Sequence, residues 1–165
     1  MKKPRIFLDM DDVVADWKVL AQQLAGRTWA PGTFHLPDQD WNKIRDYERF
    51  YRDLPVKPGA YELVDCCRTY AIENNTFMAF LTALPHDNDV PFAAYDKVNW
   101  AQKYFPNIPV LFGPYSVDKW KHCKPGDILI DDRVSNCNQW TEAGGISHIY
   151  TTWENCKPWL LSTLK

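Results

Sequence analysis

The sequence lacks several patterns that mark other classes of protein. No run of about 20 apolar residues exists to span a membrane, and the apolar stretch near the amino terminus is too short for a signal peptide. The five cysteines show no C-x-x-C spacing and the four histidines match no metal-ligand pattern, which favours reduced thiols over a zinc site. With a net charge of -2 there is no basic excess, so we expect no nucleic-acid partner. These absences favour a cytoplasmic protein without a membrane partner.

The residues that are present predict one α/β domain. The length of 165 residues suits a single domain, and apolar residues make up 45% of it. Short continuous apolar runs alternate with helical patterns, which is typical of a parallel Rossmann-like sheet with helices on both faces. We predict strands over 5–9, 76–82, 108–112, 127–131 and 146–150, with helices over 13–25, from Ala60, before Pro106, and from Val134 to Gly144-Gly145.

Polar residues follow the predicted strands where each of them ends. Asp9 ends the first strand, Thr82 the second, and Asp131 with Asp132 the fourth. In parallel sheets a ligand site lies outside the carboxyl ends of the strands. We therefore expect these side chains to converge on one edge of the sheet.

The stretch after the first strand places three carboxylates within four positions, at Asp9, Asp11 and Asp12. Two carboxylates about 4 Å apart repel by roughly 4 kcal/mol at an effective dielectric near 20. Such a cluster indicates a cation, a shared proton or a solvated acidic turn. An ionised Asp9 is a competent nucleophile toward phosphorus, and Asp11 can act as general acid and base. For Asp131 and Asp132 the alternative role is to cap the following helix.

Four motifs in order resemble those of the haloacid dehalogenase superfamily of phosphotransferases: DMDDVVAD at 9–16, FLTALP at 80–85, a lysine, and ILIDDR at 128–133. The longer stretches YDKVNWAQKYFPN, KHCKPGDILIDDR and LPVKPGAYELV look like the 5'(3')-deoxyribonucleotidases. The resemblance runs over most of the chain. It implies a phosphomonoesterase that acts on deoxyribonucleoside monophosphates through an aspartyl-phosphate intermediate.

The resemblance also implies roles for single residues. Phosphoryl transfer needs charge neutralisation, which calls for Mg²⁺ bound by hard oxygen ligands. Asp9 is expected to be the nucleophile and Asp11 the general acid and base. The phosphate is expected to contact Thr82, Ala83 and Lys121. The expected metal ligands are Asp9, the Asp11 carbonyl and Asp131, with Asp132 in support.

Lys121 is expected because the family lysine stands ten positions before the first acid of the IDD motif. Lys119 and Lys124 are the nearby alternatives. The chain departs from the family at Asp12, where Gly is usual, and at Ala83, where Ser is common.

The insertion after the first strand resembles the family's small helical cap, which we place at 16–57 within the 1–165 domain. Its aromatic residues either stack on a nucleobase or pack the cap itself, and Trp41 and Phe34 are the candidates for stacking. A compact pocket would suit pyrimidines such as dUMP and dTMP. The resemblance also suggests a homodimer. The alternatives are a related phosphatase for another small ester or a nucleic-acid 3'-phosphate, and an inactive nucleotide-binding module.

Overall fold

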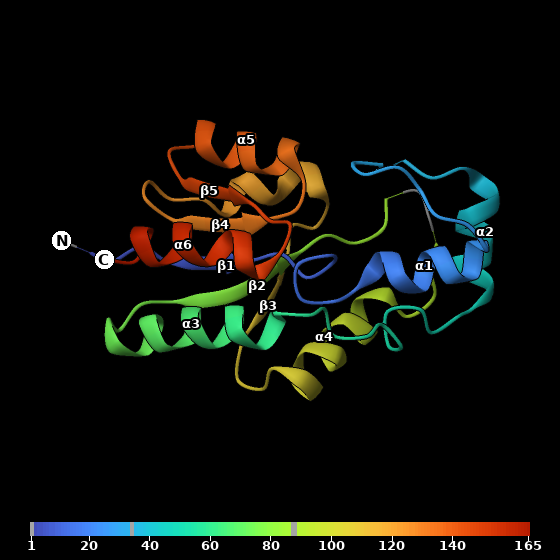
Figure 1. Ribbon diagram of the computed structural model, residues 1–165, viewed down its shortest axis with the longest axis horizontal. Coiled ribbons are helices and arrows are strands. Elements are labelled where there is room, and N and C mark those ends of the chain that lie inside the picture. Colours follow the sequence, from blue (N-terminus) through green and yellow to red (C-terminus); the bar gives the residue numbers. More distant parts are fainter. Residues whose placement is uncertain (1, 34, 87–88) are drawn as a thin grey trace.

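The computed structural model describes residues 2–33, 35–86 and 89–165. Its centre is a parallel sheet with the strand order β3-β2-β1-β4-β5 (Figure 1). The strands are β1 (Ile6–Leu8), β2 (Met78–Thr82), β3 (Val110–Phe112), β4 (Ile128–Asp131) and β5 (Ile146–Ile149). The predicted parallel α/β sheet is confirmed, with each strand slightly shorter than its apolar run.

Alternating side chains of the strands pack on opposite faces of the sheet, as the strand period of two requires. Ile6 and Leu8 belong to the larger core, while Phe7 between them packs on the other face, where its ring lies 5.3 Å from that of Trp140. Helices α3 (Ala60–Glu73), α4 (Ala93–Tyr104) and α6 (Trp153–Thr163) contribute buried side chains to the larger core, and α5 (Val134–Glu142) covers the other face. Both faces of the sheet are therefore covered.

Helices α1 (Trp17–Ala25) and α2 (Asp38–Asp46) lie beyond the carboxyl ends of the strands (Figure 1). We call residues 16–57 the cap segment; these bounds stay a prediction. Its apolar contacts are aromatic, since the Trp17 ring lies 5.8 Å from that of Trp41 and 5.6 Å from that of Phe50. These rings belong to the larger core, which therefore continues from the sheet into the cap segment.

The predicted start of the first helix is wrong by four residues, because α1 begins at Trp17. Asp12 adopts a left-handed conformation with φ of 62°, and its N–H donates to the Ala15 carbonyl at 2.7 Å. The chain turns there instead of entering a helix. The apolar residues Val13 and Val14 are buried by this turn, and in the sequence they are indistinguishable from the first apolar residues of an amphipathic helix.

Three elements have no counterpart in the predictions: α2, α6 and the 3-10 helix η1 (Ser116–His122). Helix α2 has only two apolar residues, Trp41 and Ile44, so its sequence gives little apolar pattern to detect. Helix α6 contains Pro158, and a proline in the interior of a segment argues against a helix there. No helix in the described ranges is long and apolar enough to cross a membrane.

We predict that Phe80→Ala in β2 lowers the free energy of unfolding by about 3–5 kcal/mol, because it opens a cavity in the core. Phe80 is fully buried, and its ring lies 5.7 Å from that of Phe105. The control Ile72→Ala removes a side chain that is 73% exposed and should change stability by no more than about 0.5 kcal/mol. Urea denaturation measures both, and equal losses would contradict this account of the core.

Candidate active site

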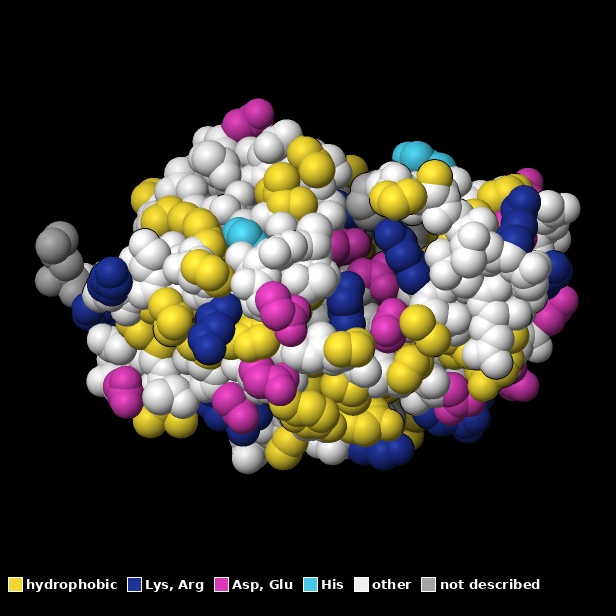
Figure 2. Space-filling model, viewed as in Figure 1, with side chains coloured by type: hydrophobic (Ala, Val, Ile, Leu, Met, Phe, Trp, Pro, Cys, Tyr) yellow, Lys and Arg dark blue, Asp and Glu magenta, His cyan; other side chains and the backbone are white. Residues whose placement is uncertain are grey.

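A cavity of about 390 Å³ opens between the carboxyl edge of the sheet and the cap segment. The three acids of the DMDD motif line one side of it, and Trp17 and Trp41 of the cap segment line another. In Figure 2, acidic and basic side chains lie next to each other in the hollow between the two parts of the molecule. The volume falls in the range of small-molecule sites, roughly 300–1,000 Å³. The predicted edge of the sheet therefore faces a pocket lined by charged side chains.

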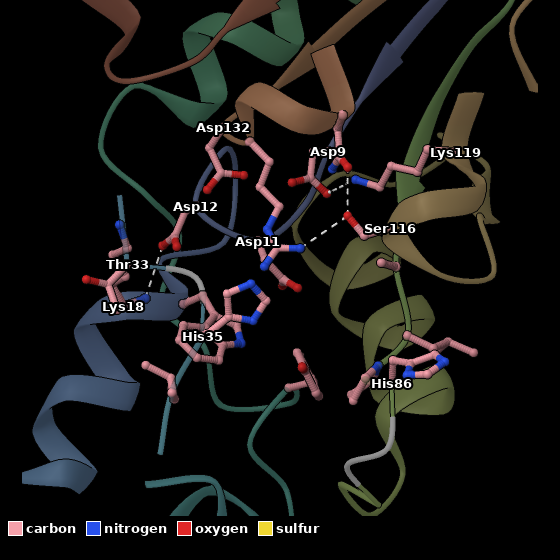
Figure 3. A pocket seen from close by; sticks show the side chains of 18 of the residues that line it. Asp9, Asp11, Asp12, Lys18, Thr33, His35, His86, Ser116, Lys119 and Asp132 are labelled. Atoms are coloured by element: carbon pink, nitrogen blue, oxygen red, sulfur yellow. Dashed lines mark hydrogen bonds and ion pairs between the residues drawn. The ribbon is translucent and has the colours of Figure 1, made fainter. Parts of the chain in front are cut away.

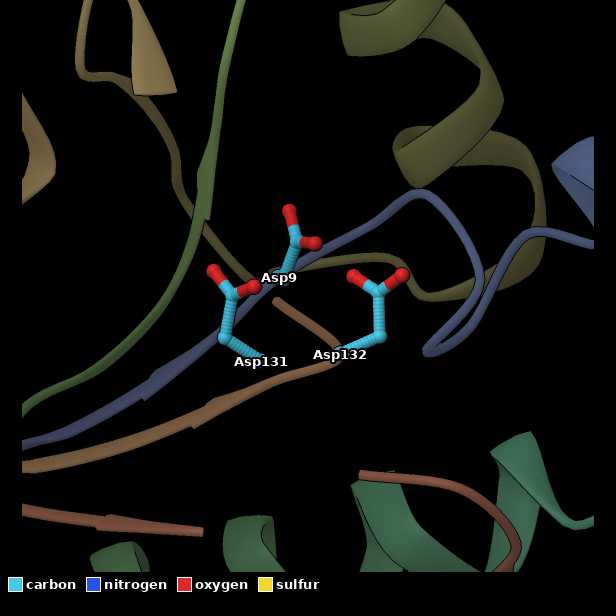
Figure 4. A group of neighbouring side chains, drawn as sticks. All are labelled: Asp9, Asp131 and Asp132. Carbon is cyan, nitrogen blue, oxygen red and sulfur yellow. The ribbon is translucent and has the colours of Figure 1, made fainter. Parts of the chain in front are cut away.

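Three carboxylates converge at this edge: Asp9 after β1, and Asp131 and Asp132 at the end of β4 (Figure 4). One oxygen of each lies within 4.8 Å of the others. Burial and the charge of Asp9 raise the pKa of both Asp131 and Asp132. A divalent cation would relieve this repulsion, and carboxylate oxygens are the ligands that Mg²⁺ prefers. The donor set therefore fits a hard divalent cation.

Lys119 of η1 is the cation that the structure places inside this cluster. Its Nζ donates to Asp9 Oδ1 and to Asp131 Oδ2, both at 2.7 Å, and its side chain is only 2% exposed. Burial lowers the pKa of Lys119, but the charges of Asp131 and Asp9 outweigh this effect and raise it above the usual lysine value. Lys119 is therefore held as an ammonium ion between the two acids. The other oxygen of Asp9 points toward Asp132 (Figure 3).

Lys121, the lysine chosen by its spacing, lies away from the acids. Its side chain is 58% exposed and pairs with Asp118. The sequence-based choice is thus corrected to Lys119, which stands twelve positions before Asp131 where the family has ten. Because the polar turn between η1 and β4 separates the lysine from the strand, its length can vary without moving the lysine out of the site. Counting positions across that turn is what misled the choice.

Asp11 is held by a second buried lysine that the sequence reasoning missed. Lys97 of α4 donates from Nζ to Asp11 Oδ2 at 2.8 Å, to Thr82 Oγ1 at 2.9 Å and to the Ala83 carbonyl at 2.8 Å. All three ammonium hydrogens are thereby used. The signal was present in the sequence, because Lys97 stands three and four positions before the buried Trp100 and Ala101. A lysine on the apolar face of a helix needs a buried acceptor.

Of the two residues predicted to contact the phosphate, Thr82 and Ala83, only Ala83 lines the cavity. Ala83 lines the cavity, whereas Thr82 is fully buried behind it with its hydroxyl on Lys97. Their contact with phosphate stays a prediction.

Asp12, which stands where the family usually has Gly, accepts hydrogen bonds from residues near both ends of the cap segment. Its Oδ1 accepts from the Lys18 N–H at 3.0 Å, and its carbonyl accepts from Lys57 Nζ at 2.8 Å. Burial raises the pKa of Asp12 to about 6; the Lys18 hydrogen bond opposes this effect, and the charge of Asp11 adds to it. Asp is among the residues that tolerate a left-handed conformation, so the loop turns as a Gly would allow.

Of the two aromatic candidates in the cap segment, Trp41 lines the cavity and Phe34 lies outside the described residues. Trp41 also packs edge-on against Trp17, which lines the cavity too. Trp41 therefore packs the cap segment and also lines the cavity, and its stacking on a nucleobase stays a prediction.

Comparison with solved structures identifies the class of fold. The chain is similar to a hydrolase from Streptococcus pneumoniae TIGR4, with 16% identity and a TM-score of 0.52 over 97% of this chain and 99% of that one. It is also similar to the putative HAD-hydrolase YfnB from Bacillus subtilis bound to magnesium, with 11% identity and a TM-score of 0.51 over 89% of this chain and 86% of that one. The fold is thus that of the haloacid dehalogenase-like hydrolases.

The family is shown by a sequence model rather than by a close relative. The model described as "5' nucleotidase, deoxy (Pyrimidine), cytosolic type C protein" matches residues 3–156. No curated protein matches the chain. Because the match spans most of the sequence, the chain belongs to this family of deoxyribonucleotidases and is a hydrolase of the 5'-nucleotidase type.

We predict that Lys119→Met lowers phosphatase activity by at least 10²-fold, since removing one fixed electrostatic donor typically costs about 10²–10³-fold. The matched variant Lys121→Met should stay near the parent activity, because an exposed ion pair contributes little. Steady-state hydrolysis of 4-nitrophenyl phosphate measures both. The reverse order of effects would restore Lys121 to the site.

Proposed function

We propose that the protein is a magnesium-dependent phosphomonoesterase of deoxyribonucleoside monophosphates. The observation that carries this proposal is the convergence of Asp9, Asp131, Asp132 and Lys119 beside one cavity, which Asp9, Asp132 and Lys119 line together with Asp11. Membership of the deoxyribonucleotidase family supports the same substrate class. The cavity of about 390 Å³ lies at the lower end of the range of small-molecule sites, which agrees with a small substrate.

Asp9 is the proposed nucleophile. Hydrogen bonds from Lys119 Nζ and from the N–H of the neighbouring Met10 reach Oδ1 of Asp9, and they fix the carboxylate after β1. An oxygen of Asp9 attacks phosphorus, the phosphorus–oxygen ester bond breaks, and an aspartyl-phosphate forms. Lys119 offsets the negative charge of the phosphate that enters between the acids.

Asp11 is the proposed general acid and base. It donates a proton to the leaving oxygen of the nucleoside and then accepts the proton of the water that attacks the aspartyl-phosphate. Phosphate and free Asp9 are the products of this second step. The lysine contact described above fixes the Asp11 side chain on the wall of the cavity that Ala83 also lines.

We assign the Mg²⁺ ligands to Asp9, the carbonyl of Asp11 and Asp132. Asp131 is also within reach, but its oxygens already accept hydrogen bonds from Lys119, from Asn136 Nδ2 and from the Arg133 N–H. Asp132 lines the cavity instead. The sequence-based roles of the two acids are thus exchanged in this proposal, and Asp131 holds the lysine. When bound, the ion would neutralise phosphate charge and orient the ester.

The nucleoside is proposed to rest against Trp41 and Trp17, which are among the residues of the cap segment that line the cavity. Stacking of a base on an aromatic side chain contributes about 1–3 kcal/mol. The homodimer and the cytoplasmic location stay predictions; the family's description as cytosolic agrees with the location.

A panel of nucleoside and sugar monophosphates, assayed with Mg²⁺, tests the substrate. We expect deoxyribonucleotides, with pyrimidines ahead of purines, to give the highest kcat/KM. Activity should disappear with excess chelator and return with Mg²⁺, whereas Ca²⁺, which is larger and less strict in geometry, should support it poorly. Faster hydrolysis of sugar phosphates would favour a related phosphatase, and full turnover in chelator would contradict the metal site.

Two variants separate the roles of the motif acids. Asp9→Asn should form no phosphorylated enzyme, because the nucleophile is gone. Asp11→Asn keeps the nucleophile and should lower turnover by roughly 10²–10⁴-fold, the usual range for losing general acid–base catalysis. Acid quenching with ³²P-labelled substrate measures the phosphoenzyme. A labelled protein from Asp9→Asn would place the nucleophile elsewhere, and no turnover by the parent protein would indicate an inactive binding module.

A further inference from the structure

The cap segment is fastened to the core helix α4 by a row of contacts from Arg49 to Leu54. The Trp100 Nε1–H donates to the Leu54 carbonyl at 2.8 Å, and Lys97 Nζ lies 4.5 Å from the centre of the Tyr51 ring. The third contact is an ion pair between Arg49 and Asp96. Helix α4 therefore touches the cap segment with the same face that carries Lys97.

The Arg49–Asp96 pair is two-pronged and partly enclosed. Arg49 Nε donates to Asp96 Oδ2 at 2.9 Å, and Nη2 donates to Oδ1. Asp96 is only 1% exposed. The Arg49 guanidinium also lies over the ring of Phe92, at 4.6 Å from its centre, and Phe92 is the residue before the first turn of α4. Arg49 thus holds the start of α4 through both a charged and an aromatic contact.

Lys97 follows Asp96 directly along this turn. Its ammonium group is the contact that fixes Asp11, and it also binds Thr82 and the Ala83 carbonyl at the end of β2. A helical turn moves as a unit, so a shift of Asp96 displaces Lys97 with it. Misplacement by about 1 Å at a reacting group can cost up to 10²-fold in rate.

We propose that Arg49 and Asp96 are positioning residues for the reaction, which set the place of the general acid Asp11 through Lys97. This inference rests on the proposed function, because it takes Asp11 as the acid. Neither residue lines the cavity, so their effect is exerted through α4 rather than on the substrate. The cap segment would thereby supply part of the acid's alignment as well as the cover of the site.

A leaving-group comparison separates positioning of an acid from general damage. A nucleoside alkoxide needs a proton as it departs, whereas 4-nitrophenolate departs without one. We expect Arg49→Gln to lower kcat/KM for the deoxyribonucleotide by about 10-fold and for 4-nitrophenyl phosphate by less than about 3-fold. Both losses are smaller than the roughly 10²–10⁴-fold that full loss of acid–base catalysis costs, because Asp11 itself is still present. Asp96→Asn should show the same pattern.

The chain offers a matched control at the other end of the sheet. Arg5 precedes β1 and forms a similar two-pronged pair with Asp127, which is 5% exposed. Arg5→Gln should lower the thermal midpoint about as much as Arg49→Gln does. It should leave the ratio of the two kcat/KM values unchanged, because the contacts described for the Arg5 side chain are with Asp127, the His122 carbonyl and the Phe7 ring, and none of them is with α4 or Asp11.

Arg49→Lys keeps the experiment decisive if Arg49→Gln does not fold. It preserves the positive charge but loses the fork of two donors, and the ratio should move in the same direction by a smaller factor. An unchanged ratio in the folded Arg49 variants, or the same change in Arg5→Gln, would overturn the inference. Failure of the proposed function is a separate result, since the parent protein would then hydrolyse neither substrate or would not need Asp9.

Discussion

The balance of charge at the carboxyl edge of the sheet is the constraint on which the rest of the site depends. Parallel strands deliver Asp9 and Asp131 to neighbouring positions, because β1 pairs with β4. Two buried carboxylates that close together are unstable without compensation. Lys119 provides part of it, at 2.7 Å from each acid. The three acids of the cluster, Asp132 included, could hold a metal ion that balances the rest of the charge.

A second buried lysine, Lys97, gives Asp11 a cationic partner separate from that of Asp9. Lys119 lies with the acids of β1 and β4, while Lys97 lies with Asp11 and the end of β2. The two motif acids are only two residues apart, yet each has its own cation from a different element. That separation keeps the proposed nucleophile, Asp9, and the proposed acid, Asp11, in distinct surroundings. It agrees with a reaction in which one carboxylate attacks phosphorus and the other exchanges protons.

The errors in the sequence-based account share one physical origin. Counting positions fails across turns, where the chain gains or loses residues without moving the elements that flank them; this is why Lys121 was preferred to Lys119. Apolar periodicity fails where a buried turn imitates a helix, as at Val13 and Val14. It also fails where a helix is mostly exposed, as in α2, of which only Asp40 and Ile44 are buried. Each of these sequence patterns is compatible with more than one structure.

The sequence by itself determined the sheet, its parallel order of strand and helix, and the convergence of Asp9, Asp131 and Asp132, because apolar strand runs and strand-end acids are local patterns. Tertiary structure alone decided which lysine enters the site and which acid faces the cavity. Those choices depend on contacts between residues far apart in the chain, such as Lys97 with Asp11 and Arg49 with Asp96. Long side chains reach partners that no spacing rule encodes, since their position follows from how a helix packs and not from where it stands in the sequence.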